Sequence, residues 1–389
     1  MRNQYLHLTL ITVCLAVTLA APGQVRAWVG LELDGKATGV ADPYGATGAE
    51  GSGSLGEFSA RVMYQDNLGP LEAEVHWLGQ FAHTTGDSSF STGPLPSPFR
   101  ILDLETVHSQ DDRTVLFSEI DRLLLTFTAP GFSLHVGRQA VTWGEAFYFN
   151  IGDLFGAFPV TETNRRYKPG IDAATLTVNP GPFSSLSLAV VPVKDERDNL
   201  AATALFPLGP GTLSLTGGRI LDDEKAGTGY TVDISGTQVY GSWLFTKKPD
   251  SRHYWQAVAG AQRQIGPYTL IMGELFRNGW GSGDPDDYPS LLFTEEYAAG
   301  NIFTLGRYSA ALQVSRQVSP LVTMTPALFG NLTDGSALLR VDGALSLSDL
   351  TDISGGFFLG MGKRPDEGIP MSEYGQIPFS IYVEIVHNI

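Results

Sequence analysis

The sequence predicts an all-β fold, a transmembrane antiparallel up-and-down β-barrel of about 18 strands, with 16 as the alternative count. Three observations indicate this fold. Apolar and polar residues alternate over many short stretches, which is the period of a half-buried strand. Turns rich in Pro and Gly separate these stretches, and short turns alternate with long polar loops. After residue 27, no apolar run approaches the length of a transmembrane helix.

The composition agrees with a barrel wall that faces lipid. Glycine is frequent, with 45 of 389 residues where the usual share is about 7%. Charged residues are scarce, at 17% where the usual share is about 25%. Aromatic residues make up 11%, which argues against a disordered chain. The formal net charge of −16 lacks the basic surface that nucleic-acid binding requires, so we expect no nucleic-acid partner.

Residues 1–27 have the pattern of a secretory signal peptide. After a positively charged start, an apolar run covers Leu8–Ala21, and Val25–Ala27 ends in a small-residue cleavage pattern. We expect this signal to be removed, leaving the β-barrel over residues 28–389. Because Cys14 lies in the signal, the barrel has no disulfide and no thiolate metal site. A secreted chain with membrane-like strands and no helical anchor indicates the bacterial outer membrane.

Taken in order, the alternation predicts a first strand at Trp28–Asp34, a Gly- and Ala-rich loop at 35–53, and a hairpin. The hairpin joins the strands Ser54–Gln65 and Leu71–His83, each with one apolar and one polar face. Residues 84–113 are predicted as a polar loop. Pro and Gly mark strand ends at further short turns, because Pro cannot donate into a β-ladder. These turns are Pro130-Gly131, Pro180-Gly181-Pro182, Gly209-Pro210-Gly211, Gly266-Pro267 and Ser319-Pro320.

Longer connections are predicted near 144–169, 279–300 and 363–376. Short turns on one side and long loops on the other are the sidedness of outer-membrane barrels, with the turns in the periplasm. If both chain ends lie on the turn side, an even strand count requires Gly229–Ile234 to be a strand of its own. The last strand, Pro378–Ile389, must pair with the first, because an open edge in lipid leaves backbone groups unpaired.

The loop 144–169 is too long and too aromatic to be a plain connector, and we interpret it as the candidate constriction of a pore. Folded inward, it narrows the lumen; the alternatives are an external lid or an aromatic girdle at the membrane interface. Its basic residues suit anions in the pore, or lipopolysaccharide phosphates outside it. The charged residues of the loop are Glu145, Asp153, Glu162, Arg165, Arg166 and Lys168.

Alternation also places charged residues on the inner face of the predicted strands. Arg138 joins them if Gly137 forms a bulge. Mixed charges inside a barrel set a field that selects solutes, or they form ion pairs that stabilise the wall, and the two roles are compatible. The candidate pore-lining residues are Arg61, Glu72, Glu74, Arg122, Arg138, Glu274, Arg307, Arg340, Asp342 and Glu384.

Several short motifs carry a resemblance to a known group. They are Gly137-Arg138-Gln139, Trp143-Gly144, Asn150, Asp153-Leu154-Phe155 and Lys168-Pro169-Gly170-Ile171-Asp172-Ala173. With these motifs, the chain resembles a little-characterised group of Gram-negative porin-like outer-membrane proteins, and it is broadly similar to alginate-export-type barrels. The resemblance covers most of the barrel and implies a channel without fixing its solute. Ile151 and Gly152 replace the Asn-Pro continuation that is frequent in the group.

We therefore expect a channel for the diffusion of small hydrophilic solutes. One alternative is a dedicated export or uptake channel, for example for an acidic polysaccharide, which would need an uninterrupted arginine track. Another is a structural sheath for a periplasmic or cytochrome partner. The expected partners are outer-membrane lipid, lipopolysaccharide, the barrel-assembly machinery and small solutes, and the pattern leaves open whether the barrel forms a homo-oligomer.

We expect no enzymatic activity, metal or cofactor. The tetrapeptide Gly86-Asp87-Ser88-Ser89 faintly resembles an esterase motif, but it sits in a polar loop without a histidine-containing partner block. The histidines do not show the spacing of a metal site. No haem-attachment motif is present in the sequence.

Overall fold

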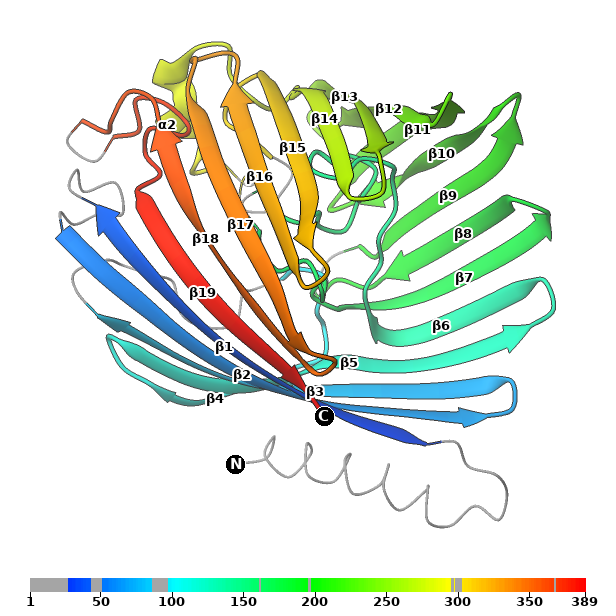
Figure 1. Cartoon of the computed structure of the whole chain (residues 1–389). Helices are drawn as coiled ribbons and strands as arrows, with labels where there is room; N and C mark the ends of the chain where they lie inside the picture. Colours follow the sequence, from blue (N-terminus) through cyan, green and yellow to red (C-terminus); the bar gives the residue numbers. More distant parts are fainter. Residues whose placement is uncertain are drawn as a thin grey trace.

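The computed structural model describes residues 27–42, 51–85, 97–160, 162–194, 197–294, 297, 303–366 and 369–389. Within them, the chain forms one antiparallel sheet that closes on itself (Figure 1). Closure occurs at β1 (Trp28–Asp42), which pairs with both β2 (Gly51–Leu68) and β19 (Phe379–Asn388). The predicted signal, apart from Ala27, and the tetrapeptide at 86–89 lie outside the described residues.

Eighteen strands make up the closed wall, which confirms the predicted barrel and its larger strand count. The nineteenth, β4, is an extra strand that pairs with β5, because β3 pairs directly with β5. The remaining strands are β3 (Leu71–Thr85), β4 (Glu105–Gln110), β5 (Thr114–Ala129), β6 (Phe132–Gln139), β7 (Ile171–Gly181), β8 (Ser184–Val191), β9 (Asn199–Leu208), β10 (Gly211–Ile220), β11 (Asp223–Ile234), β12 (Thr237–Lys247), β13 (His253–Ile265), β14 (Thr269–Arg277), β15 (Tyr308–Ser319), β16 (Val322–Asn331), β17 (Ala337–Ser348) and β18 (Thr351–Met361).

The predicted loop at 35–53 is wrong in most of its length, because β1 extends to Asp42 and β2 begins at Gly51. Residues of β1 as far along as Val40 have partners on both sides, so two hydrogen-bonded ladders hold a Gly- and Ala-rich stretch with weak alternation. The predicted loop at 84–113 likewise contains β4. The predicted strand Gly229–Ile234 is the second half of β11.

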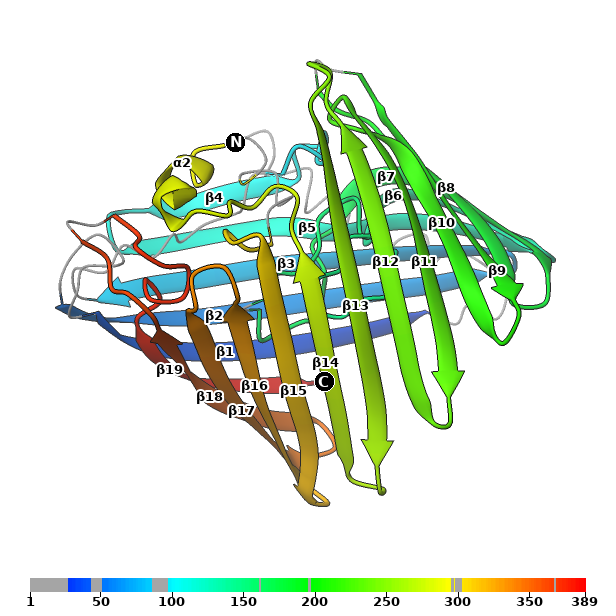
Figure 2. The ribbon, with the colours of Figure 1, turned by 90° about the horizontal axis from the view of Figure 1, so that it is seen from above.

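The connections on one side of the barrel are all short, and the five predicted short turns are among them. The connections on the other side include the predicted long ones but also the two-residue turn 221–222. The long connections are residues 140–170, 278–307 and 362–378. Both ends of the barrel chain lie on the turn side, where the N–H of Ile389 donates to the carbonyl of Leu31 at 2.8 Å. Figure 2 shows the strands from above. We call the side of the barrel that carries the long connections the loop side, and the opposite side the turn side.

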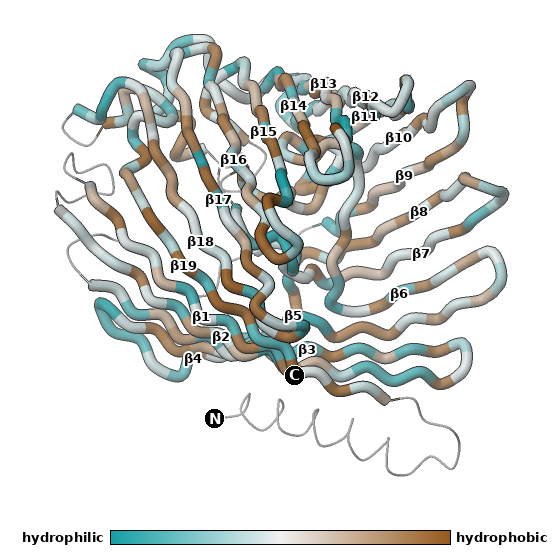
Figure 3. The backbone as a smooth tube through the Cα atoms, viewed as in Figure 1, coloured by the Kyte–Doolittle hydropathy of each residue, from teal (hydrophilic) through white to brown (hydrophobic). Residues whose placement is uncertain are grey.

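The strands alternate between an apolar outer face and a more polar inner face. In β19, Ile381 and Val383 are exposed on the outer face, whereas Tyr382 and Glu384 between and beside them are buried on the inner face. Figure 3 shows the same alternation of hydrophobic and hydrophilic residues along many strands. An apolar outer band around a closed antiparallel wall is typical of transmembrane barrels.

One part of the wall is completed by a segment outside the regular strand order. β6 ends at Gln139, so it covers only residues 123–129 of the longer strand β5. Above it, residues 97–110 take its place: β4 pairs with residues 115–119 of β5. On the other side, the N–H of Asp172 in β7 donates to the carbonyl of Phe99 at 2.9 Å. We call residues 97–110 the wall insert.

Helix is scarce in the described part of the chain. It comprises the 3₁₀ turn Pro285–Asp287 (η1) and the single turn Tyr288–Leu291 (α2), both in the connection between β14 and β15. Among the described residues, no helix has the length and apolar character needed to cross a membrane.

Candidate functional site: a loop across the barrel lumen

The connection between β6 and β7, residues 140–170, runs through the inside of the barrel, and we call it the lumen loop. Its first bend is fixed by Gly144, whose φ of 93° favours glycine. The side chain of Asn150 donates to the carbonyl of Trp143 at 2.8 Å. A Cβ atom at Gly144 would lie 2.0 Å from the Asn150 side-chain oxygen, so the bend tolerates only glycine. The WG and asparagine motifs therefore shape the entry of the loop into the lumen.

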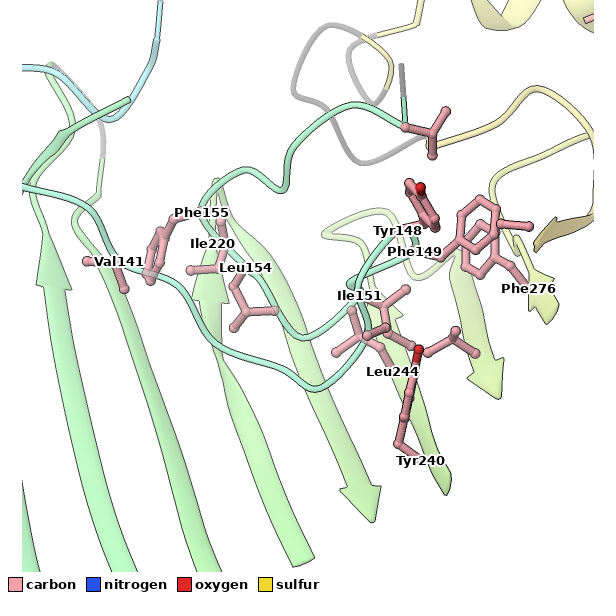
Figure 4. Packing of buried hydrophobic residues seen from close by; sticks show 14 of the residues in the cluster. Val141, Tyr148, Phe149, Ile151, Leu154, Phe155, Ile220, Tyr240, Leu244 and Phe276 are labelled. Atoms are coloured by element: carbon pink, nitrogen blue, oxygen red, sulfur yellow. The ribbon is translucent and has the colours of Figure 1, made fainter. Parts of the chain in front are cut away.

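The first half of the lumen loop packs as an apolar cluster against the inner wall (Figure 4). The ring of Phe149 stacks on Phe276 of β14, with a centroid distance of 4.8 Å. Tyr148 meets Phe329 of β16 edge-on at 4.7 Å. Leu154 and the neighbouring loop residues belong to the same cluster as residues of β10, β12 and β13. This packing places a row of aromatic side chains inside the barrel, against an apolar part of its inner face.

Glu274 of β14 anchors the loop to this wall. Its carboxylate accepts the backbone N–H groups of Phe147, Tyr148 and Phe149 at 2.6, 3.0 and 3.0 Å. It also accepts the hydroxyl of Tyr240 at 2.6 Å. Glu274 is only 2% exposed, and a carboxylate that accepts several N–H groups compensates for its burial. This predicted pore-lining residue faces inward, and the loop covers it.

Arg340 of β17 holds the loop at a second point. Its guanidinium donates to the backbone carbonyls of Val160 and Glu162 at 3.4 and 3.2 Å. It also donates to the hydroxyl of Tyr148 at 3.2 Å, and it pairs with Asp342 at 2.8 Å. The predicted inward residues Arg340 and Asp342 thus lie together.

The second half of the lumen loop crosses to the wall formed by β19, β1 and β2. Asn164 donates to the carboxylate of Glu384 at 2.9 Å. Arg166 pairs with Glu32 of β1 at 3.0 Å, and Lys36 donates to Thr163 at 3.4 Å. The loop therefore contacts strands on both sides of the lumen, from β14 and β17 to β1.

The loop returns to the wall beside a buried ion pair. Lys168 pairs with Asp153 at 2.6 Å and also donates to the carbonyl of Val141. Burial raises the pKa of Asp153 to about 6, while the ammonium of Lys168 opposes the shift. Burial also lowers the pKa of Lys168, and Asp153 opposes that shift. Because Lys168 reaches Val141, the two ends of the loop lie close together.

A network of charged side chains lies beside this return. Arg61 pairs with Asp121 at 2.7 Å, and Arg122 lies 3.2 Å from the same carboxylate. Arg122 also donates to the carbonyl of Lys168. Arg100 of the wall insert pairs with Glu119 at 2.6 Å. Predicted residues Arg61 and Arg122 thus meet a carboxylate that was not predicted.

Two other loop residues have partners on or near the inner wall. Arg165 donates to the carbonyls of Phe147 and Pro159 at 2.7 and 3.2 Å and lies over the ring of Phe147. Glu145 accepts the hydroxyl of Ser242 in β12 at 2.6 Å. The charged residues of the loop are thus mostly engaged with the loop itself or with the strands.

The prediction that Arg138 lines the pore is wrong. Pairing on both sides of β6 runs through Gly137 without a register shift, so there is no bulge to turn Arg138 inward. Its side chain is 0% exposed and pairs with Asp172 at 2.8 Å. It also donates to the carbonyl of Leu102 in the wall insert at 2.6 Å. Arg138 therefore joins β6, β7 and the insert within the wall.

For the remaining predicted pore-lining residues, no direct hydrogen bond or ion pair to the lumen loop is found among the described residues. Glu72 accepts from Gln65 at 2.7 Å near the first short turn, and Glu74 lies 3.0 Å from the ring of His76. Arg307 precedes β15 and is exposed. The lumen loop therefore does not bring Glu72, Glu74 or Arg307 together with Arg340.

Sequence reasoning missed five inner-face residues of this site, including Glu32, which lies within the predicted first strand. Asp34 and Lys36 fall at or beyond the end of the predicted first strand. Glu57 has the same parity as Arg61 in β2, so the alternation that found Arg61 also identifies Glu57. Asp121 lies at a register shift between β3 and β5, which shifts its parity relative to Glu119.

The lumen-facing residues of β1, β2 and β19 form a surface that we call the acidic wall: Glu32, Asp34, Lys36, Glu57, Arg61 and Glu384. Glu57 interacts electrostatically with Lys36 and Glu384 across the strands. Arg61 is neutralised by Asp121. Arg166 pairs with Glu32, so the remaining carboxylates Asp34, Glu57 and Glu384 outnumber the one remaining cation of the acidic wall, Lys36. Among the described residues, no group of His, Cys, Asp and Glu is arranged to hold a metal ion.

On the loop side, Glu373 joins the long connections to one another. Its carboxyl accepts from the side chain of Asn331 at 2.7 Å and from the N–H of Gly306 at 3.3 Å. Burial raises the pKa of Glu373 to about 8, and the hydrogen bonds from the backbone oppose the shift. Glu373 thus ties the connection 362–378 to residues before β15 and at the end of β16.

No protein-family model matches the sequence, and no curated protein matches it. Solved structures do resemble the barrel. OccAB1 of Acinetobacter baumannii has a TM-score of 0.57 at 12% identity, covering 96% of this chain and 99% of that one. OccK5 (OpdH) of Pseudomonas aeruginosa has a TM-score of 0.58 at 8% identity, with coverages of 93% and 98%.

A BenF-like porin from Pseudomonas fluorescens Pf-5 is also similar, with a TM-score of 0.55 at 11% identity and coverages of 94% and 98%. That protein is described as a porin. The matches extend over nearly the whole length of each chain, so the likeness concerns the complete barrel. At these identities, the comparison establishes a fold in common with these three structures.

Proposed function

We propose that this protein is a bacterial outer-membrane channel through which small hydrophilic solutes diffuse, narrowed by the lumen loop. The proposal depends on one observation. The wall is closed, with an apolar outer face and charged residues on its inner face, and one loop crosses the lumen and is bonded to strands on both sides. A barrel of this strand number has room for an aqueous lumen. The BenF-like porin that shares its fold supports the same role.

The proposed localisation follows from the same features. Residues 1–27 would direct export and be removed, and the barrel-assembly machinery would insert residues 28–389 into the outer membrane. Diffusion through a pore is passive and requires no catalytic group and no cofactor. Small solutes would then be the ligands of the lumen, and membrane lipid the surroundings of the outer wall.

The distribution of charge favours a mixed or cation-preferring path over a channel dedicated to an acidic polysaccharide. Arg61 and Arg122 lie beside the same aspartate, Asp121, and Arg340 lies beside Asp342. Arg138 is buried in the wall. An arginine track is thus interrupted at each step, whereas the acidic wall presents carboxylates to the lumen.

The test is recording of the refolded chain, residues 28–389, in a planar bilayer with a salt gradient. We expect discrete, stable conductance steps and a reversal potential that indicates a preference for cations, because carboxylates dominate the acidic wall. Folding is verified independently by the heat-dependent change in electrophoretic mobility. A folded barrel without conductance would contradict the channel, and an anion preference would contradict the assigned selectivity.

A further inference from the structure

The outer wall of β13 to β16 contains a hollow of about 520 Å³. Its floor is one row of residues across the four strands, in which Ala259 is paired with Leu275, Leu275 with Ala310, and Ala310 with Gly330. Apart from Leu275, these residues are small. Leu275 projects from the middle of the row and is 61% exposed, which shows that the row lies on the outer face. The hollow is thus an apolar groove in the face that the proposed function turns toward lipid.

A cation sits at the loop-side end of this groove. Arg277 follows Leu275 by two residues on the same face of β14, a distance of about 7 Å along a strand. Its guanidinium lies 3.3 Å from the ring centre of Trp255 and donates to the carbonyl of Trp255 at 2.7 Å. No carboxylate pairs with Arg277 among the described residues. Tyr308, its partner in β15, is exposed beside it.

The two features recognise an amphiphile with an anionic head and hydrocarbon chains. Lipid tails are as apolar as the outer wall, so the groove favours a bound chain through its shape and not through hydrophobicity. A preference for one lipid over another must therefore come from the charge of Arg277. A guanidinium is suited to phosphate, with which it forms charge-assisted hydrogen bonds. Tyr and Trp at the same level are typical of the interface between hydrocarbon and head groups.

We propose that this groove binds one lipopolysaccharide molecule of the outer leaflet, with a lipid A phosphate at Arg277 and an acyl chain over Ala259, Ala310 and Gly330. This inference rests on the proposed outer-membrane placement, which turns the loop side and therefore Arg277 outward. A lipopolysaccharide leaflet supplies the phosphate at the level of Arg277 and the chain below it. A second copy of this chain is the other occupant that the test distinguishes.

The experiment measures binding of bis-phosphorylated lipid A, and of its dephosphorylated form, to the refolded barrel in detergent by native mass spectrometry. We expect the wild type to prefer the phosphorylated lipid. Arg277→Gln should weaken its binding about tenfold, as expected for loss of a charged hydrogen bond. Ala310→Phe fills the groove and leaves Arg277 in place, so it should weaken the binding of both forms of lipid A.

Arg263→Gln is the matched control, because Arg263 is an exposed cation of β13 near the short turns and outside the groove. Its binding should equal that of the wild type, and all variants should keep the wild-type conductance steps. Equal binding of both lipids, or unchanged binding by Arg277→Gln, would overturn the inference while leaving the channel intact. A wild-type oligomer that Ala310→Phe dissociates would also overturn it, because a second copy would then occupy the groove.

Discussion

Replacing residues 142–168 by a linker of about six Gly and Ser residues should raise the single-channel conductance on the order of several-fold. The lumen loop is bonded to Glu274 and Arg340 on one side and to Glu384 on the other, so it occupies the cross-section of the barrel. Its two ends lie close together, because Lys168 reaches the carbonyl of Val141. A short linker can therefore close the chain without distorting β6 or β7.

Glu274→Gln is a milder test of the same prediction, because it weakens the attachment of the lumen loop without removing the loop. It keeps a carbonyl acceptor but removes the negative charge that three loop N–H groups share. We expect frequent transitions to larger conductance, because the loop would detach intermittently from β14. Conductance that is unchanged by the deletion, in a barrel shown to be folded, would place the narrowest point of the pore elsewhere.

Asp172→Ala should destabilise the barrel by about 3–5 kcal/mol, because it leaves a fully buried guanidinium without its counter-charge. Arg138 pairs with Asp172 at 2.8 Å and is 0% exposed. The same carboxylate accepts the N–H of Leu102 at 2.8 Å, so the wall insert also loses a contact with β7. Urea-induced unfolding in lipid vesicles measures the free energy of unfolding directly.

Asp250→Ala provides the control for this substitution. Asp250 pairs with Arg252 at 2.6 Å, but both side chains are more than half exposed, and such pairs contribute little. A double variant, Arg138→Met with Asp172→Leu, should recover most of the lost stability, because it removes both buried charges together. Equal stability of Asp172→Ala and Asp250→Ala would show that the buried pair does not hold the wall together.

The barrel could be predicted from the sequence because its wall repeats one rule. Alternation and turn residues identified the hairpin of β2 and β3, and the even strand count followed from the sidedness of turns and loops. The rule failed where pairing, and not side-chain pattern, creates the strand. Lys36 lies in a Gly- and Ala-rich stretch that β2 and β19 hold from both sides.

The candidate site could be predicted less completely, because it depends on contacts between distant segments. Parity placed Glu274, Arg340 and Glu384 on the inner face, but it carried no information on which of them the loop would cover. Arg138 was expected in the lumen if Gly137 formed a bulge. The structure instead buries Arg138 against the wall insert, about 36 residues earlier in the chain. Nothing in the local pattern of β6 indicates that contact.

The most direct test of the channel is modification of a single introduced thiol during single-channel recording. Glu57 faces the lumen and the neighbouring Phe58 faces outward in β2, and the only native cysteine, Cys14, lies in the predicted signal. A water-soluble cationic thiosulfonate should lower the current of Glu57→Cys in one step and leave that of Phe58→Cys unchanged. Modification of Glu57→Cys without any change in current would contradict an ion path along the inner wall of this barrel.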